Sequence, residues 1–292
     1  MGWRIFFFLC LTMVGTLALS FFVPAELPYG TVPLLAGSIL GGWAMLRMDG
    51  RGPGALGFHL APSAGGELLG GVALGVMVAG SVAVGMVATG SLRWSPEAGT
   101  ALDYVREAGA SLWLFTFPAA GEEALMRGYL FQALAESWGG AWALWITSFL
   151  FGLLHLGNPN TSWIGLLNIL VAGLFLGVVY LKTASLWWAT GAHLGWNWTH
   201  GFLSDLPVSG LELVNAPLLE PVTRGPEWLS GGSFGPEGSV LSTLVLSVVT
   251  LVLWKSSWLQ PGVRAKEARP LILSGEARSS SSGIESGLPE IG

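Results

Sequence analysis

Two adjacent carboxylates and a guanidinium lie in the middle of an apolar stretch of this sequence. Glu122, Glu123 and Arg127 fall inside the apolar run 108–134. Placing a charged side chain at the centre of a membrane helix costs about 2.5–3.5 kcal/mol. A chain therefore carries such groups only where they find partners or do chemistry. A carboxylate that is partly removed from water is suited to act as a general base.

The spacing of these three residues separates the two carboxylates. Glu123 and Arg127 are four residues apart, so they lie on one helix face and can pair. Glu122 is rotated by about 100° around the same helix and has no such partner there. We therefore predict that Glu123 and Arg127 form a structural ion pair, and that Glu122 faces a cavity.

Two later apolar runs carry side chains that could assist a base. Phe151 and His155 are four residues apart, and so are His193 and Asn197, so each pair projects from one face of its helix. A lone histidine in a membrane helix more commonly forms a structural hydrogen bond across helices. Because three separate helices carry complementary groups, the set indicates a functional site.

The composition indicates the elements that must position these groups. The chain has 292 residues, of which 52% are hydrophobic and 11% charged, and its mean hydropathy is +0.61. A soluble domain has about 25% charged residues. We predict an all-α, polytopic membrane bundle of about eight transmembrane helices. Their expected ranges are 3–23, 31–46, 68–88, 108–134, 140–156, 163–181, 186–203 and 240–254.

Other classes of protein are excluded by the same counts. The 13 basic residues form no cluster that could follow a nucleic-acid backbone, so no nucleic-acid partner is expected. Cys10 is the only cysteine, so no intrachain disulfide can form. The 43 glycines suit close approach of helices within lipid.

We divide the chain into a membrane-embedded helical domain, 1–258, and a disordered tail, 259–292, where the composition becomes polar. Basic residues concentrate on the cytoplasmic side of membrane proteins. If the N-terminus is inside, nine basic residues lie inside and three outside. Both termini are therefore expected in the cytoplasm. The three outer residues are Arg93, Arg106 and Arg224.

Three motifs on separate helices resemble those of the CPBP family, over a core of about 108–204. This family contains the type II CAAX prenyl endopeptidases and the Abi, bacteriocin-immunity-like membrane proteins of bacteria. The loop 228–238 is also similar to a loop of bacterial members. The motifs read Glu122-Glu123-x-x-x-Arg127, Phe151-x-x-x-His155 and His193-x-x-x-Asn197.

The resemblance implies an intramembrane, glutamate-dependent endopeptidase in the bacterial cytoplasmic membrane. Glu122 would match the catalytic carboxylate, and His155 the histidine that helps it to activate water. His193 and Asn197 would match the pair that stabilises the tetrahedral oxyanion. The expected partners are the lipid bilayer and a peptide or protein substrate, which in this family can be C-terminal and lipidated.

Two alternatives stay open at this point. Glu122, His155 and His193 could in principle bind a divalent metal such as zinc, although Asn197 is a poor zinc ligand and no His-Glu-x-x-His motif is present. The chain could also be a non-proteolytic immunity or scaffold factor that binds a partner through the same polar cluster.

The position of His155 raises a further question. It lies near the end of its helix, on the predicted outer side, whereas Glu122 and His193 are expected nearer the middle of the membrane. Either the helix begins later than the range 140–156, or the cavity leans outward. The sequence does not decide between them.

Overall fold

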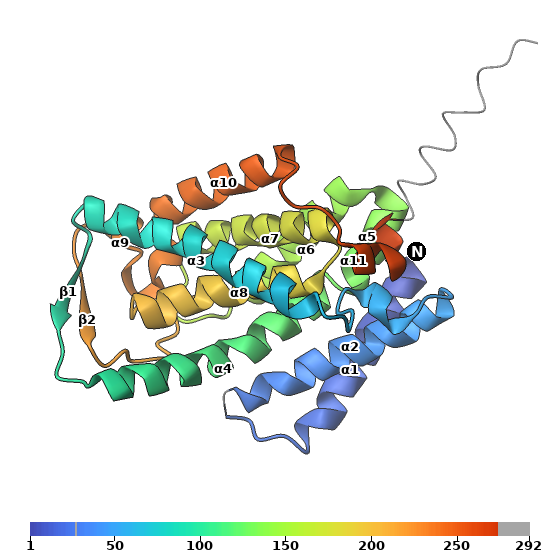
Figure 1. Ribbon diagram of the computed structural model, residues 1–292, viewed down its shortest axis with the longest axis horizontal. Coiled ribbons are helices and arrows are strands. Elements are labelled where there is room, and N and C mark those ends of the chain that lie inside the picture. The colour runs from blue at the N-terminus through green and yellow to red at the C-terminus, as the bar shows by residue number, and fades with distance from the viewer. Residues whose placement is uncertain (27, 274–292) are drawn as a thin grey trace, which may run out of the picture.

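The structure is a computed structural model that describes residues 1–26 and 28–273. It is mostly helical (71%), as predicted from the composition. Within the described residues the only sheet is a pair of antiparallel strands, β1 (Leu92–Pro96) and β2 (Leu219–Thr223). The sheet lies at the left end of the molecule in Figure 1, where β1 precedes α4.

The helices follow the apolar runs of the sequence. The long ones are α1 (Gly2–Ser20), α2 (Val32–Met48), α3 (Ala64–Ala88), α4 (Ala101–Met126), α5 (Tyr129–Trp138), α6 (Gly140–Leu154), α7 (Trp163–Thr183), α8 (Leu186–Trp198) and α10 (Val240–Lys255). Short helical segments are η1 (Tyr29–Thr31), η2 (Pro53–Leu56), η3 (Thr199–Leu203), α9 (Glu227–Ser230), η4 (Gly232–Phe234), η5 (Pro236–Gly238) and α11 (Val263–Glu267).

Four of these helices are long and apolar enough to cross a membrane. They are α1, the continuous segment Tyr29–Met48 that contains α2, α3 and α7. Two more, α6 and α10, are apolar but shorter. Helix α4 has 26 residues and carries the buried charges at its C-terminal end. The chain therefore has the helices of an integral membrane protein.

The apolar run 108–134, which we expected to form one helix, is broken in two. Helix α4 ends at Met126 and α5 begins at Tyr129. Gly128 leaves the helical conformation, with φ −68° and ψ −127°, and a Cβ at this position would overlap the carbonyl group of Ala124. The break places Arg127 at the end of α4, where its side chain turns back toward Glu123.

Helix α8 is the central element of the bundle. It lies between α3 and α4 in Figure 1 and also contacts α7. Its approach to α3 depends on small residues, because a Cβ at Gly75 would lie 2.7 Å from the backbone nitrogen of Trp196. Glycines on both helices thus let the two backbones pack directly, as expected for helices in lipid.

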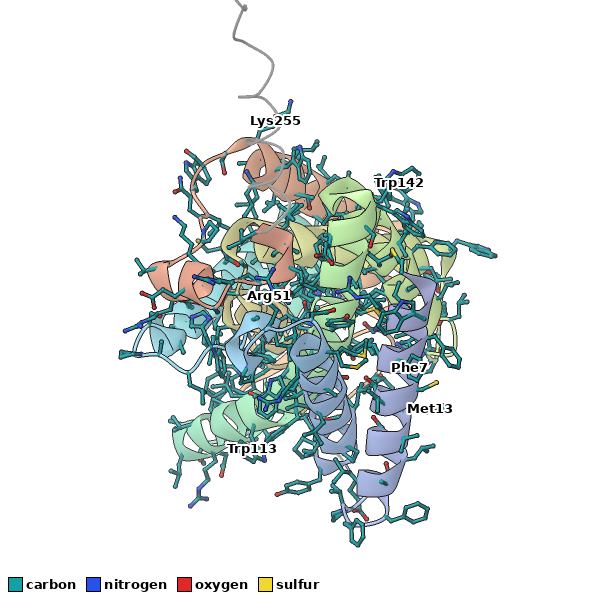
Figure 2. The ribbon with its side chains drawn as sticks, turned by 90° about the vertical axis from the view of Figure 1, so that its right-hand side faces the viewer. Phe7, Met13, Arg51, Trp113, Trp142 and Lys255 are labelled. Carbon is teal, nitrogen blue, oxygen red and sulfur yellow. The ribbon has the colours of Figure 1, made fainter. Side chains whose placement is uncertain are left out.

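Helix α1 packs mainly on α2 and presents apolar side chains outward. Phe7 and Met13 are 50% and 58% exposed, and Figure 2 shows them on α1 at the edge of the molecule. Such a surface is suited to lipid rather than water. At its N-terminal end, Arg4 pairs with Asp49 at 2.6 Å and with Glu136 at 2.7 Å. These contacts join α1 to the ends of α2 and α5.

The segment 259–273 differs from the expected disordered tail. It contains α11, and Leu271 is buried at the end of the bundle that also holds α5. The backbone N–H of Leu271 donates to Oε1 of the buried Gln132 at 2.8 Å. Apolar residues of this mostly polar segment therefore pack against the helical bundle, which the composition of the segment does not predict. The rest of the predicted tail, 274–292, lies outside the described residues.

The close contact between α3 and α8 leads to a prediction about stability. Gly75→Ala should destabilise the protein by on the order of 1–3 kcal/mol, because the added methyl group overlaps the backbone of α8. Gly80→Ala is the matched control on the same helix, since no atom of the described chain lies within 4 Å of its added Cβ. It should be neutral or stabilising by roughly 0.5–1 kcal/mol. Thermal unfolding in detergent measures both, and equal effects would contradict the packing described.

Candidate active site

The C-terminal turn of α4 carries the two carboxylates in different environments. The Glu123 side chain is 0% exposed, whereas that of Glu122 is 26% exposed. Their rotation around the helix axis directs one into the protein and the other toward a cavity. This is the separation expected from the sequence.

Glu123 forms the expected pair with Arg127. Nη1 of Arg127 lies 2.9 Å from Oε1 of Glu123, and both side chains are 0% exposed. Nη2 of Arg127 donates to the carbonyl oxygen of Gly173 on α7 at 2.9 Å. The guanidinium also lies over the ring of Phe151, 4.8 Å from its centre. The pair therefore fixes α4 against both α6 and α7.

Glu123 has a second partner that the spacing did not predict. Its Oε1 lies 3.0 Å from Nδ1 of His193 on α8. Because a carboxylate can only accept, Nδ1 must carry the proton of this hydrogen bond. Nε2 of His193 is then directed toward Glu122, whose Oε2 is 3.8 Å away. Glu123 thus orients a cavity residue as well as balancing Arg127.

His155 is oriented by the backbone of its own helix. It is the C-terminal cap of α6, and its Nδ1 lies 2.8 Å from the carbonyl oxygen of Phe151. Since a carbonyl oxygen only accepts, Nδ1 is the donor and Nε2 is free. The ring of Phe151 lies 4.7 Å from that of His155 and 5.9 Å from that of His193, measured between centroids. Phe151 therefore fills the space between the two histidines.

Asn197 lies one helical turn beyond His193 on α8. Only 9% of the residue is exposed, and its amide makes no hydrogen bond to any part of the chain that the structure describes. A buried amide with unused donors is expected to find a partner in a ligand or in water. Asn197 can thus donate to a molecule that enters the cavity.

All four predicted catalytic side chains line one cavity of about 220 Å³. Glu122 comes from α4, His155 from the end of α6, and His193 and Asn197 from α8. Apolar side chains of α4 and α7 form much of the remaining wall. The other lining residues are Thr31, Phe115, Pro118, Phe151, Asn158, Ile169, Ala172, Phe175, Leu176, Trp196, Val208, Ser209, Leu211, Leu213 and Glu237.

The cavity lies toward the end of the bundle opposite to Arg4 and α11. Its wall includes Thr31 from the α1–α2 connection and Asn158 from the α6–α7 connection, together with the loop after η3. These segments share one end of the helices. Helix α6 begins at Gly140, as expected, and His155 at its end lines the cavity together with these connections.

One acidic residue of this cavity was not predicted from the sequence. Glu237 lies in η5, inside the loop 228–238 that we singled out only for its family resemblance. The loop has no helical periodicity, so nothing in its spacing predicted that Glu237 would reach the same cavity as Glu122. Asn158 and Ser209 are also connection residues, and the amide of Asn158 donates to the carbonyl oxygen of Ser209 at 3.0 Å.

The donors at this site do not fit a preformed metal centre. Among residues 1–26 and 28–273, no three His, Cys, Asp or Glu side chains form a group that could hold a metal ion. His193 and His155 both use Nδ1 for hydrogen bonds within the protein and keep Nε2 available, an orientation that metal-binding histidines also adopt.

Comparison with known proteins agrees with the three motifs. Residues 105–199 match the family described as "Type II CAAX prenyl endopeptidase Rce1-like". The matched segment is about a third of the chain and contains all seven motif residues. No curated protein and no solved structure matches the chain. The resemblance seen in the sequence is thus confirmed over residues 105–199, which are similar to the type II CAAX prenyl endopeptidase Rce1-like family.

Proposed function

We propose that this protein is an intramembrane endopeptidase that hydrolyses a peptide bond with water activated by Glu122 and His155. One observation carries the proposal. Glu122, His155, His193 and Asn197 come from three helices and line the same cavity, where Glu122 keeps limited contact with solvent. Peptide hydrolysis requires a base, a positioned water and fixed donors for the developing oxyanion, and this set can supply all three.

The proposed reaction begins with a water molecule held by Glu122 and by the free Nε2 of His155. Glu122 accepts a proton from this water while the oxygen attacks the carbonyl carbon of the scissile bond. The oxyanion that forms accepts hydrogen bonds from Asn197 and from Nε2 of a protonated His193. Glu122 then returns the proton to the leaving amine, and the C–N bond breaks.

His193 is suited to stabilising the oxyanion because carboxylates lie on both sides of its ring. Glu123 accepts from Nδ1 at 3.0 Å, and Glu122 lies 3.8 Å from Nε2. An imidazole whose two nitrogens both face carboxylates can carry a proton on each nitrogen. In that form Nε2 becomes a donor, as oxyanion stabilisation requires.

We further propose about eight membrane spans, with both termini in the cytoplasm of a bacterial cell. The excess of basic residues on the Arg4 side supports this orientation. The cavity would then open toward the non-cytoplasmic half of the membrane. The substrate would be a peptide or protein segment that enters a largely apolar cavity, which a C-terminal, lipidated segment would also suit.

The first test of this proposal is Glu122→Gln. The substitution keeps the size of the side chain but removes the base, so the cleavage rate should fall by roughly 10²–10⁴-fold while the protein folds and inserts normally. Purified protein in liposomes can be incubated with a peptide library, and new termini counted by mass spectrometry. Glu107→Gln, on the same helix but outside the cavity lining, is the control and should retain activity.

Undiminished cleavage by the Glu122→Gln protein would refute the assignment of the base. A non-proteolytic immunity or scaffold factor gives a different pattern. It would keep its cellular activity with Glu122→Gln and lose it when the ion pair between Glu123 and Arg127 is broken.

The second test separates catalysis from stability at two buried asparagines. Asn197→Ala should lower kcat by about 10²–10³-fold, the usual effect of removing an oxyanion donor, with little change in Tm. Asn168→Ala should instead lower Tm, because its amide donates to the carbonyl oxygens of Glu237 and Ser239 at 2.7 and 2.8 Å. Enzyme kinetics and thermal unfolding on both variants check the contrast. A large loss of stability with Asn197→Ala would contradict a purely catalytic role for Asn197.

A further inference from the structure

A second buried carboxylate lies in the wall of the cavity. Glu237 is only 4% exposed and comes from η5, far in sequence from the three motifs. No basic side chain pairs with it among the described residues. A buried charge without a counter-ion requires several hydrogen-bond donors, and Glu237 has three.

The donors to Glu237 come from two different elements. Oε1 accepts from the indole Nε1 of Trp196 at 2.8 Å. Oε2 accepts from the backbone N–H of Ser209 at 2.5 Å and from its hydroxyl at 2.7 Å. Both carboxylate oxygens are thus occupied by protein groups, so the arrangement suits positioning rather than proton transfer to a substrate.

Each element that Glu237 holds is part of the cavity. Trp196 lies on α8 between His193 and Asn197 and itself lines the cavity. Ser209 belongs to the loop 204–214, whose residues Val208, Leu211 and Leu213 form the outer part of the wall. Glu237 therefore connects the helix that carries two candidate catalytic residues to the loop that covers them.

Ser209 adopts a conformation that requires outside support. Its φ is +50°, in the left-handed region that non-glycine residues seldom occupy. Such a conformation persists only where the surroundings impose it. Here two of the three hydrogen bonds of Glu237 go to Ser209, and the next residue, Gly210, donates its N–H to Phe234 at 3.0 Å.

The backbone of Glu237 is held in place by contacts with α7 and α10. The amide of Asn168 on α7 donates to the carbonyl oxygens of Glu237 and Ser239, and the hydroxyl of Thr243 on α10 donates to Oδ1 of Asn168 at 2.6 Å. The carboxylate thus projects from a support fixed by two membrane helices. A rigid support of this kind is what a positioning residue needs.

We propose that Glu237 is a positioning residue that holds the loop 204–214 closed over the cavity and sets Trp196 beside His193 and Asn197. Its place over catalytic residues rests on the proposed peptidase function, but its effect on the loop does not. Loss of the carboxylate should release Ser209 from its strained conformation and open the outer wall of the cavity.

The test measures access to the cavity without relying on activity. Cys10→Ser removes the only cysteine, and Ala172→Cys then places a single thiol in the cavity wall on α7. In this background Glu237→Ala should raise the rate of labelling by a water-soluble maleimide by roughly tenfold or more, because hydrogen bonds to a charged acceptor are the strong ones. Glu237→Gln should give a smaller increase, because its amide oxygen can still accept a hydrogen bond but cannot serve all three donors.

Two further variants make the result specific. Glu212→Gln alters an exposed carboxylate of the same loop that forms no hydrogen bond or ion pair with any described residue, so labelling should not change. Ser209→Ala removes only the hydroxyl donor and should give an increase below that of Glu237→Ala. If Glu237→Ala does not fold, Glu237→Gln and Ser209→Ala carry the test.

Kinetic measurements then connect the loop to substrate binding. With peptide substrate, Glu237→Gln should raise KM more than it lowers kcat, in contrast to Glu122→Gln. Labelling rates that are equal for the Glu237, Ser209 and Glu212 variants would overturn the positioning role. Faster labelling of the Glu237 variants, in a protein that cleaves no peptide, would instead keep this role and refute the peptidase function.

Discussion

The fully buried carboxylate of Glu123 is the interaction on which the site depends. One of its oxygens receives Arg127 from its own helix and His193 from α8. A single buried carboxylate would be strongly unfavourable in this environment, and so would a single buried guanidinium. Together, with the carbonyl of Gly173 and the ring of Phe151, they form a polar cluster that joins four helices. Removing either Glu123 or Arg127 would leave a buried charge without its counter-ion.

This cluster also explains how two neighbouring carboxylates can have different functions. Glu123 faces the packed interior, where all its contacts are within the protein. Glu122 faces the cavity, where its carboxylate is partly exposed. His193 connects the two, with one ring nitrogen toward each carboxylate. The structural pair thereby orients His193, which is one of the four candidate catalytic residues.

Two buried carboxylates hold residues of the cavity wall from opposite sides. On the inner side Glu123 orients His193, and on the outer side Glu237 binds Trp196 and Ser209. Helix α8 receives both contacts, and its glycines allow it to pack directly on α3. The helix is thus restrained at several points along its length. Precise placement of His193 and Asn197 follows from these restraints rather than from the sequence of α8 alone.

Much of this protein could be predicted from local sequence. Apolar runs predict helices because their backbone polar groups must be satisfied internally in lipid, and the spacing of Glu123 and Arg127 predicts their pairing because it is a property of one helix. The same reasoning placed His193 and Asn197 on one face. Residues 105–199 carry the family motifs, and these too are local patterns.

Other features were decided only by tertiary structure, because they join segments that are distant in the chain. The hydrogen bond from His193 to Glu123 spans 70 residues, and that from Trp196 to Glu237 spans 41. The ordered position of Leu271 likewise depends on Gln132, which is 139 residues away. Helical periodicity reports which residues share a face of one helix. It contains no information about which loop or helix will lie opposite that face. Only the folded chain therefore shows that His155, His193 and Asn197 line the same cavity as Glu122, and that Glu237 binds Trp196 and Ser209.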